Sequence, residues 1–130
     1  MTQPIHCLLI DDDLDDRDFF NQALKTIDKN INFHYSSTAA DALDKLKSGE
    51  LSPHYIFLDL NMMPVNGLDC LKQIKKIAKV VDVPVIIYST SINEEIKYHT
   101  LEAGAFDHFE KPSDQASLIK YLKRILQIKK

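Results

Sequence analysis

The chain has 130 residues, of which 45% are hydrophobic and 27% are charged, and its formal net charge is −3. This length and composition are typical of one globular domain and argue against a disordered chain. The acidic balance disfavours a nucleic-acid-binding groove, and no apolar run approaches the ~18 residues that span a membrane.

Five short apolar segments, which we predict to be strands, alternate along the chain with longer amphipathic segments. They are residues 5–10, 31–35, 54–58, 84–88 and 106–109. The first, third and fourth are almost continuously apolar. This pattern is typical of strands that are covered on both faces in a parallel sheet.

The segments between the strands carry apolar residues at the spacing of one helix face. The four stripes are Phe20, Ala23, Leu24 and Ile27; Ala39, Ala42, Leu43 and Leu46; Leu68, Leu71, Ile74 and Ala78; and Leu118, Leu122 and Ile125. Residues 92–103 form a weaker stripe, because Lys97, His99 and Thr100 dilute its apolar face.

The strict alternation of strand and helix predicts an α/β fold, a doubly wound parallel sheet with right-handed crossovers and helices on both faces. Cap signals agree with this division. Thr38-x-x-Asp41 and Ser91-x-x-Glu94 resemble N-terminal capping boxes, and Gly49 stands where a left-handed C-cap is favoured. Ligands of such sheets bind beyond the carboxyl ends of the strands, so polar residues there are the functional candidates.

Polar residues follow four of the predicted strands. Asp11 and Asp12 follow the first, Asp59 the third, Ser89 the fourth and Lys111 the fifth. Carboxylates that crowd at one edge raise one another's pKa, and Mg²⁺, which prefers oxygen ligands, relieves their repulsion. Three carboxylates carry about −3, which Mg²⁺ and Lys111 balance with about +3. Such a site can hold an incoming phosphoryl group, for which aspartate is a nucleophile.

Each of these residues also has an ordinary interpretation when it is taken alone. Acidic residues are favoured at helix starts, which is how we interpret Asp13, Asp15 and Asp16. Asp59 before a turn and Lys111 before a proline are common loop residues. The conjunction of carboxylates, a hydroxyl and an ammonium at the edge where this fold binds ligands is what indicates a site.

The motifs at these strand ends resemble those of a known family. They are "DD" at 11–12 after "LLI", "DLN" at 59–61, "PVIIYS" ending at Ser89, and "EKP" at 110–112. At this spacing the chain resembles, over essentially its whole length, the receiver domain of bacterial two-component response regulators. The resemblance implies a flavodoxin-like (βα)5 fold with strand order 2-1-3-4-5. It also implies one receiver domain over residues 1–130, without an output domain.

The resemblance implies a role for each residue of the site. Asp59 is the phosphoacceptor, which takes a phosphoryl group from the phosphohistidine of a histidine kinase or histidine phosphotransfer protein. Asp12, Asp59 and the backbone carbonyl of Asn61 bind Mg²⁺, and Asp11 acts through a metal-bound water. Lys111 pairs with the oxygens of the phosphoryl group.

Two further positions are implied to act as switches. Ser89 occupies the position of the hydroxyl that moves to bond the phosphoryl group. The other position, three residues before Lys111, is usually aromatic in the family and is His108 here. Either His108 serves as a smaller polar switch or the aromatic coupling is absent. The loop after Asp59 also departs from the family pattern, because Pro64 in "DLNMMPVNG" stands one place later.

We therefore expect a single-domain response regulator and not an enzyme. Phosphorylation would change the surface around the fourth helix, the fifth strand and the fifth helix, roughly residues 92–125, which a downstream protein partner reads. We expect no nucleic-acid or membrane partner, and a monomer or weak dimer. A cytoplasmic location is expected, because no secretory signal is visible and two cysteines do not make a disulfide framework.

Two other functions remain open at this point. An aspartyl-phosphate hydrolase of the haloacid dehalogenase type also uses a strand-end aspartate with Mg²⁺, but residues 11–15 lack the Thr or Val of its D-x-D-x-T/V pattern. A receiver-like module that is never phosphorylated would act as a scaffold. The intact set at the strand ends, which is Asp11, Asp12, Asp59, Ser89 and Lys111, disfavours this scaffold.

Overall fold

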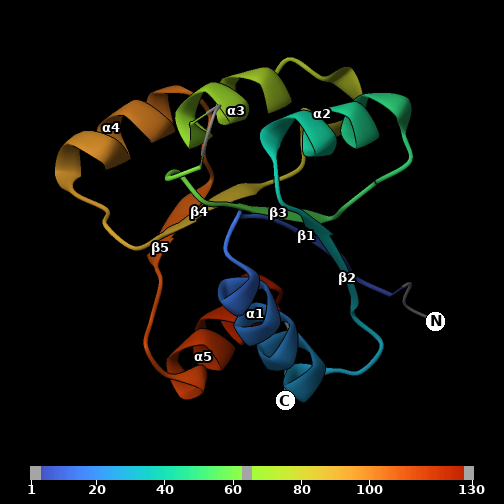
Figure 1. Cartoon of the computed structure of the whole chain (residues 1–130), viewed down its shortest axis with the longest axis vertical. Helices are drawn as coiled ribbons and strands as arrows, with labels where there is room; N and C mark the ends of the chain where they lie inside the picture. Colours follow the sequence, from blue (N-terminus) through green and yellow to red (C-terminus); the bar gives the residue numbers. More distant parts are fainter. Residues whose placement is uncertain (1–3, 63–65, 128–130) are drawn as a thin grey trace.

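The computed structural model describes residues 4–62 and 66–127, which form a five-stranded parallel sheet with helices on both faces (Figure 1). The strands are β1 His6–Ile10, β2 Asn32–Ser36, β3 Tyr55–Leu58, β4 Val85–Ser89 and β5 Asp107–Glu110. Each lies within one residue of its predicted bounds. Their order in the sheet is β2-β1-β3-β4-β5, which confirms the order that the resemblance implies.

The helices divide between the two faces as a doubly wound sheet requires. They are α1 Leu14–Ile27, α2 Ala39–Ser48, α3 Gly67–Ile74, α4 Glu94–Glu102 and α5 Gln115–Ile125, with a short 3₁₀ turn, η1 Ala78–Val80, before β4. Helices α1 and α5 cover one face, and α2, α3 and α4 cover the other (Figure 1). No helix of the described ranges is long and apolar enough to cross a bilayer.

Alternate residues of each central strand enter two different cores. In β1, Leu8 and Ile10 pack with α2 and α3, while Cys7 and Leu9 pack with α1 and α5. All four side chains are fully buried. Burial on both faces therefore explains why the central strands are continuously apolar. The edge strand β2 is only half-buried along most of its length.

Two of the predicted apolar stripes are confirmed in full, and one is partly wrong. Every stripe residue of α1 and α2 is buried. Helix α3 ends at Ile74, so Ala78 lies in the 3₁₀ turn, where it is exposed. The turn continues the core contact with Ile77 and Val80 instead, because tighter winding shifts which residues face the sheet. In α5, Leu118 is buried, as predicted.

The caps follow local side-chain chemistry. Thr38 caps α2 by accepting a hydrogen bond from the Asp41 main-chain N–H, as predicted. The predicted cap at Ser91 is wrong, since Asn93 caps α4 and accepts from the Ile96 N–H at 2.8 Å. Asparagine is as good an N-cap as serine, so the helix starts two residues later than the pattern indicated.

Helix α4 is the most weakly packed helix of the sheet. Thr100 is the one buried residue among its nine, whereas Tyr98 and Leu101 are 62% and 54% exposed. The weak apolar stripe of residues 92–103 thus corresponds to a helix that rests on the sheet with few apolar anchors. A helix of this kind can move at low cost in packing energy.

Candidate functional site

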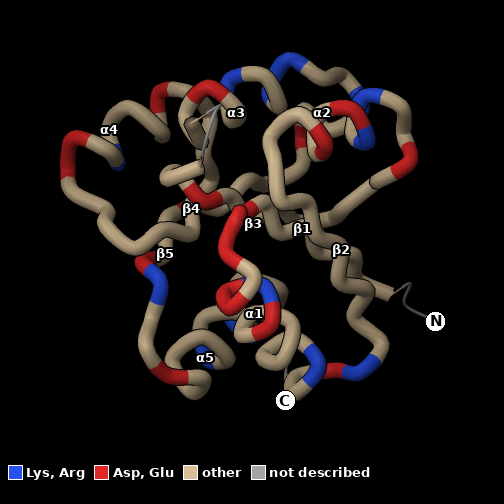
Figure 2. The backbone as a smooth tube through the Cα atoms, viewed as in Figure 1, with Lys and Arg blue, Asp and Glu red and all other residues tan. Residues whose placement is uncertain are grey.

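Polar side chains from the carboxyl ends of four strands lie together at one edge of the sheet. The β1 and β3 ends are in register, since the Asp59 N–H donates to the Ile10 carbonyl at 3.0 Å, which places Asp11 beside Asp59. Ser89 ends β4, and Lys111 directly follows β5. Figure 2 shows acidic residues in red from the end of β1 through the start of α1, close to the end of β3. The convergence predicted from the strand ends is therefore present.

Three carboxylates are close enough to share one cation. Asp11, Asp12 and Asp59 each offer an oxygen, and these oxygens lie within 4.8 Å of one another. Asp11 is fully buried and Asp59 is 4% exposed, while Asp12 is exposed. Buried carboxylates with few partners are costly unless a cation neutralises them, and an all-oxygen donor set suits Mg²⁺. The residues present therefore fit a hard divalent cation.

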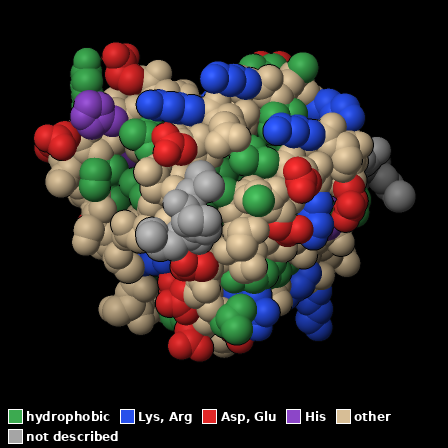
Figure 3. Space-filling view, turned by 45° about the horizontal axis from the view of Figure 1, so that its top comes forward, with side chains coloured by type: hydrophobic (Ala, Val, Ile, Leu, Met, Phe, Trp, Pro, Cys, Tyr) green, Lys and Arg blue, Asp and Glu red, His purple; other side chains and the backbone are tan. Residues whose placement is uncertain are grey.

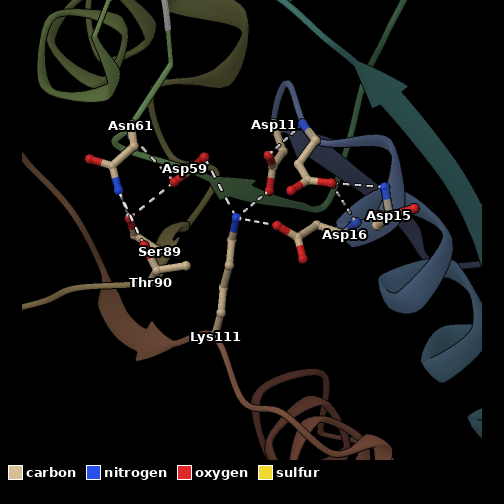
Figure 4. Close-up of polar contacts among 9 residues, drawn as sticks. Asp11, Asp15, Asp16, Asp59, Asn61, Ser89, Thr90 and Lys111 are labelled. Atoms are coloured by element: carbon tan, nitrogen blue, oxygen red, sulfur yellow. Dashed lines mark hydrogen bonds and ion pairs between the residues drawn. The ribbon is translucent and has the colours of Figure 1, made fainter.

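Lys111 is the local positive charge of this edge (Figure 4). Its Nζ lies 2.8 Å from Asp11 Oδ2, 2.6 Å from Asp16 Oδ2 and 3.6 Å from Asp59 Oδ2. Burial of the ammonium lowers its pKa, but the hydrogen bonds to Asp11 and Asp16 and the nearby carboxylates outweigh this and raise the pKa. Lys111 is therefore charged at any physiological pH.

The same charges act on the carboxyl group of Asp11. Burial raises the pKa of Asp11 to about 6, although the hydrogen bonds from Lys111 and from the Asp13 N–H lower it. The Asp59 charge raises this pKa further. A bound divalent cation would favour the ionised carboxylate and offset the cost of its burial.

Asp59 receives hydrogen bonds from two neighbours on its Oδ1 atom. The Ser89 hydroxyl donates at 3.0 Å and the Asn61 main-chain N–H at 3.2 Å. The Asn61 side-chain amide also donates to Ser89 Oγ, at 3.2 Å, and to Thr90 Oγ1. The Oδ2 atom of Asp59 faces Lys111, as Figure 4 shows. The predicted site residues thus form one connected polar network around a buried carboxylate.

Asp16 is a member of this network that the sequence analysis missed. Its carboxylate binds Lys111 across 95 positions of sequence, so it is more than a helix-start charge. Asp13 does behave as predicted, as the N-cap of α1 that accepts from the Asp15 and Asp16 N–H groups. The sequence offers no separate signal for the contact of Asp16 with Lys111, because a carboxylate in the first turn of a helix already has a local explanation.

His108 and Phe109 point to opposite faces of the sheet. His108 hydrogen-bonds through Nε2 to the Thr100 hydroxyl of α4. Phe109 stacks on Tyr121 of α5 with ring centroids 4.0 Å apart. Burial lowers the pKa of His108, although Asp107 opposes the shift. The residue in the aromatic switch position therefore makes a polar contact with α4.

The loop that carries Pro64 lies outside the described residues, which stop at 62 and resume at 66. Beyond it, Asn66 caps α3 by accepting from the Asp69 N–H, and the Gly67 N–H donates to the Leu60 carbonyl at 3.0 Å. Helix α3 thus begins in direct contact with the segment that follows Asp59.

Three histidines meet at the opposite end of the sheet. The ring nitrogen Nδ1 of His6 lies 2.9 Å from Nε2 of His34. The main-chain N–H of His6 donates to Nδ1 of His54 at 2.9 Å. In the described part of the chain, the carboxylates of the strand ends form the one group with metal-ligand spacing, and these histidines do not join such a group. They form a hydrogen-bonded cluster far from the site.

Mg²⁺ is expected to stabilise the chain, and Asp12→Ala is expected to remove most of this effect. The variant deletes one of three oxygen ligands without opening the core, because Asp12 is exposed. Binding to the folded state alone adds about 1.4 kcal/mol at roughly ten times Kd. Thermal unfolding in MgCl₂ and in EDTA measures the gain. Asp15→Ala is the matched control, and an equal gain in both variants would contradict the assignment of Asp12.

Comparison with known proteins identifies the family of this chain. The family model described as the response regulator receiver domain matches residues 7–123. The chain is 37% identical over 120 residues to a protein-glutamate methylesterase/protein-glutamine glutaminase of Bacillus subtilis, which covers 90% of this chain and 32% of that protein. The chain spans only 28% to 32% of the length of this protein and of two other methylesterases of the same description. It is 27% identical to the chemotaxis protein CheY of Thermotoga maritima, over 86% of this chain and 92% of that protein.

Solved structures share the fold. The phosphorylated cyanobacterial phytochrome response regulator RcpA superposes with a TM-score of 0.85 and 23% identity, over 95% of this chain and 92% of that one. The Mn²⁺-bound form of the response regulator Rcp1 gives a TM-score of 0.82 and 24% identity, over 96% and 94% of the two chains. With the family match over residues 7–123, the chain belongs to the response regulator receiver domain family.

Proposed function

We propose that Asp59 accepts a phosphoryl group from the phosphohistidine of a histidine kinase or histidine phosphotransfer protein, in a reaction that needs Mg²⁺. One observation carries the proposal. The buried Asp59 carboxylate has a serine hydroxyl on one oxygen and the Lys111 ammonium near the other, and two more carboxylates lie within cation-sharing distance. This arrangement combines a nucleophile with the positive charge and donors that phosphoryl transfer requires.

In this reaction a carboxylate oxygen of Asp59 attacks the phosphorus atom. The P–N bond of the phosphohistidine breaks, and the imidazole nitrogen keeps the electron pair of that bond. Lys111 donates to one phosphoryl oxygen. The Ser89 hydroxyl, which donates a hydrogen bond to Asp59 Oδ1 in this structure, donates instead to a second phosphoryl oxygen. Asp11, Asp12, Asp59 and the Asn61 carbonyl would hold Mg²⁺, directly or through water. A bound ion would supply positive charge that stabilises the transferred group.

The output of this reaction is a change in the surface formed by α4, β5 and α5. Tyr98 and Phe106 are both 62% exposed there, and Leu101 is 54% exposed. Figure 3 shows hydrophobic side chains next to a histidine over α4, at the upper left of the view. Movement of Ser89 towards a phosphoryl group would shift β5 and the loosely packed α4. A downstream protein partner would read this change.

The remaining features of the proposal follow from the role of a signalling domain. The chain promotes its own phosphorylation and dephosphorylation and is not an enzyme acting on other substrates. It would work in the cytoplasm as a monomer or weak dimer, and the two buried cysteines, Cys7 and Cys70, are free thiols that suit a reducing compartment.

Acetyl phosphate with MgCl₂ is expected to add one phosphoryl group to the chain. Intact-mass spectrometry measures the addition, and peptide mapping locates it. EDTA should prevent the labelling, and hydroxylamine should reverse it, because the product is an acyl phosphate. Labelling without Mg²⁺, labelling at another residue, or no labelling would each overturn the proposal.

Two measurements separate the alternatives from the proposal: a turnover assay with phosphomonoesters and the labelling by acetyl phosphate. A haloacid-dehalogenase-type hydrolase would turn over phosphomonoesters continuously, and a scaffold module would take up no phosphoryl group. The receiver family match favours neither of them.

A further inference from the structure

The ammonium of Lys111 is held by a carboxylate from α1 and not by the phosphoacceptor. Its Nζ is 2.6 Å from Asp16 Oδ2 and 2.8 Å from Asp11 Oδ2, whereas Asp59 Oδ2 is 3.6 Å away. The contact with Asp16 is a charge-assisted hydrogen bond and the contact with Asp11 is a close ion pair, whereas Asp59 lies beyond hydrogen-bond range. Figure 4 shows the Lys111 amine between Asp59 and Asp16. The lysine is thus engaged towards α1 in this state.

Asp16 differs in this respect from the acidic residues next to it. Asp13 is the N-cap of α1, and Asp15 is exposed. The Asp16 side chain is only 28% exposed, and its Lys111 partner is 7% exposed. An ion pair that is shielded from water in this way is screened less than a surface pair. Asp16 therefore attracts Lys111 more strongly than a surface carboxylate would.

Asp16 also changes the charge balance of the site. Four carboxylates, Asp11, Asp12, Asp16 and Asp59, carry about −4, while Lys111 and a divalent cation supply about +3. A phosphoryl group on Asp59 replaces the −1 of its carboxylate with the charge of a phosphoryl group, about −1.5 to −2, so the site becomes more negative by roughly 0.5 to 1. The phosphoryl oxygens and the Asp16 carboxylate then compete for the one Lys111 ammonium. The charge of Asp16 thus opposes the phosphorylated state.

We propose that Asp16 is a positioning residue that draws the Lys111 ammonium towards α1 and so weakens the hold of the site on a phosphoryl group. This role rests on the function proposed above. The ion pair loosens when Asp59 is phosphorylated, which couples the site to the first turn of α1. Phosphorylation then changes the structure on the α1 and α5 side of the sheet as well as at α4.

The test uses beryllofluoride, which mimics a phosphoryl group on a carboxylate, and isothermal titration calorimetry with Mg²⁺ present. Asp16→Asn keeps an oxygen acceptor for Lys111 but removes the charge. It is expected to bind beryllofluoride about tenfold more tightly than the wild-type chain, a change of roughly 1.4 kcal/mol in binding free energy. Asp15→Asn removes a charge from the same helix turn and is expected to bind as the wild type does. Asp16→Ala should change affinity in the same direction as Asp16→Asn.

The outcomes separate this inference from the proposed function. If the wild-type chain binds no beryllofluoride, the phosphoacceptor site itself is wrong. If the wild type binds and Asp16→Asn binds equally or more weakly, Asp16 does not restrain Lys111. A general loosening of the fold would weaken binding, so tighter binding cannot arise from structural damage. An equal gain in Asp15→Asn would assign the effect to the charge of the helix start and overturn the role of the ion pair.

Discussion

Asp59→Asn is expected to abolish Mg²⁺-dependent labelling of the chain by acetyl phosphate. The side-chain amide of asparagine has nearly the shape of the carboxylate, but it carries no negative charge. It is therefore a poor nucleophile and a poor ligand for Mg²⁺. Intact-mass spectrometry of the variant should show the unmodified mass under conditions that label the wild-type chain fully.

The fold of this variant is expected to survive, which makes the loss interpretable. The amide oxygen of the substituted side chain can still accept the Ser89 hydroxyl and the Asn61 N–H that now bind Asp59. The substitution also removes one of the crowded negative charges, which should not lower the free energy of unfolding. Asp69→Asn, on the exposed side of α3, is the control and should label normally. A hydroxylamine-sensitive phosphoryl group on the Asp59→Asn variant would contradict the assignment of the phosphoacceptor.

The sheet was predictable because burial on two faces leaves a local signal. Strands β1, β3 and β4 are apolar at every central position, and each position faces one of the two cores. The order β2-β1-β3-β4-β5 is different, because nothing in an isolated strand says which strand lies next to it. That order came from the resemblance at the strand ends. Periodicity gives the elements, and only non-local information gives their arrangement.

The candidate site was predictable for a geometric reason. Parallel strands end at the same edge, so Asp11, Asp59 and Lys111 meet there although they lie far apart in the chain. Asp16 was not predictable in this way, since an acidic residue in the first turn of a helix has an adequate local explanation. The side-chain partner of Asp16 depends on how α1 leaves the sheet, which the pattern of residues does not encode.

The errors at Ala78 and Ser91 have a similar origin. Both come from choices between local structures that differ little in energy: a helix that continues or tightens into a 3₁₀ turn, and a cap at serine or at asparagine. Tertiary packing decides such cases. After the end of α3, Ile77 and Val80 pack into the core in place of Ala78, and this packing favours the 3₁₀ turn.

Gly67→Ala adds one methyl group and is expected to lower the free energy of unfolding more than any other substitution of this size near the site. A Cβ at this position would lie 2.4 Å from the Asp59 carbonyl oxygen and 2.5 Å from Leu60 Cα. Both are backbone atoms, so no side chain can rotate to make room. The main chain after Asp59 would have to move away from α3, breaking the hydrogen bond from the Gly67 N–H to the Leu60 carbonyl. We expect a cost of roughly 3 kcal/mol, at the upper end for overpacking.

The comparison with Gly49→Ala isolates this contact from ordinary glycine effects. Gly49 has a φ of +82°, and a Cβ there would meet the flexible Lys79 side chain, with Nζ at 3.2 Å. That substitution should cost about 1 kcal/mol through backbone strain alone, and it lies at the far end of α2, so labelling of Asp59 should be normal. Urea unfolding followed by circular dichroism measures both losses, and acetyl phosphate labelling measures the displacement of Asp59. If Gly67→Ala is no less stable than Gly49→Ala and labels as the wild type does, the close approach of α3 does not position the phosphoacceptor.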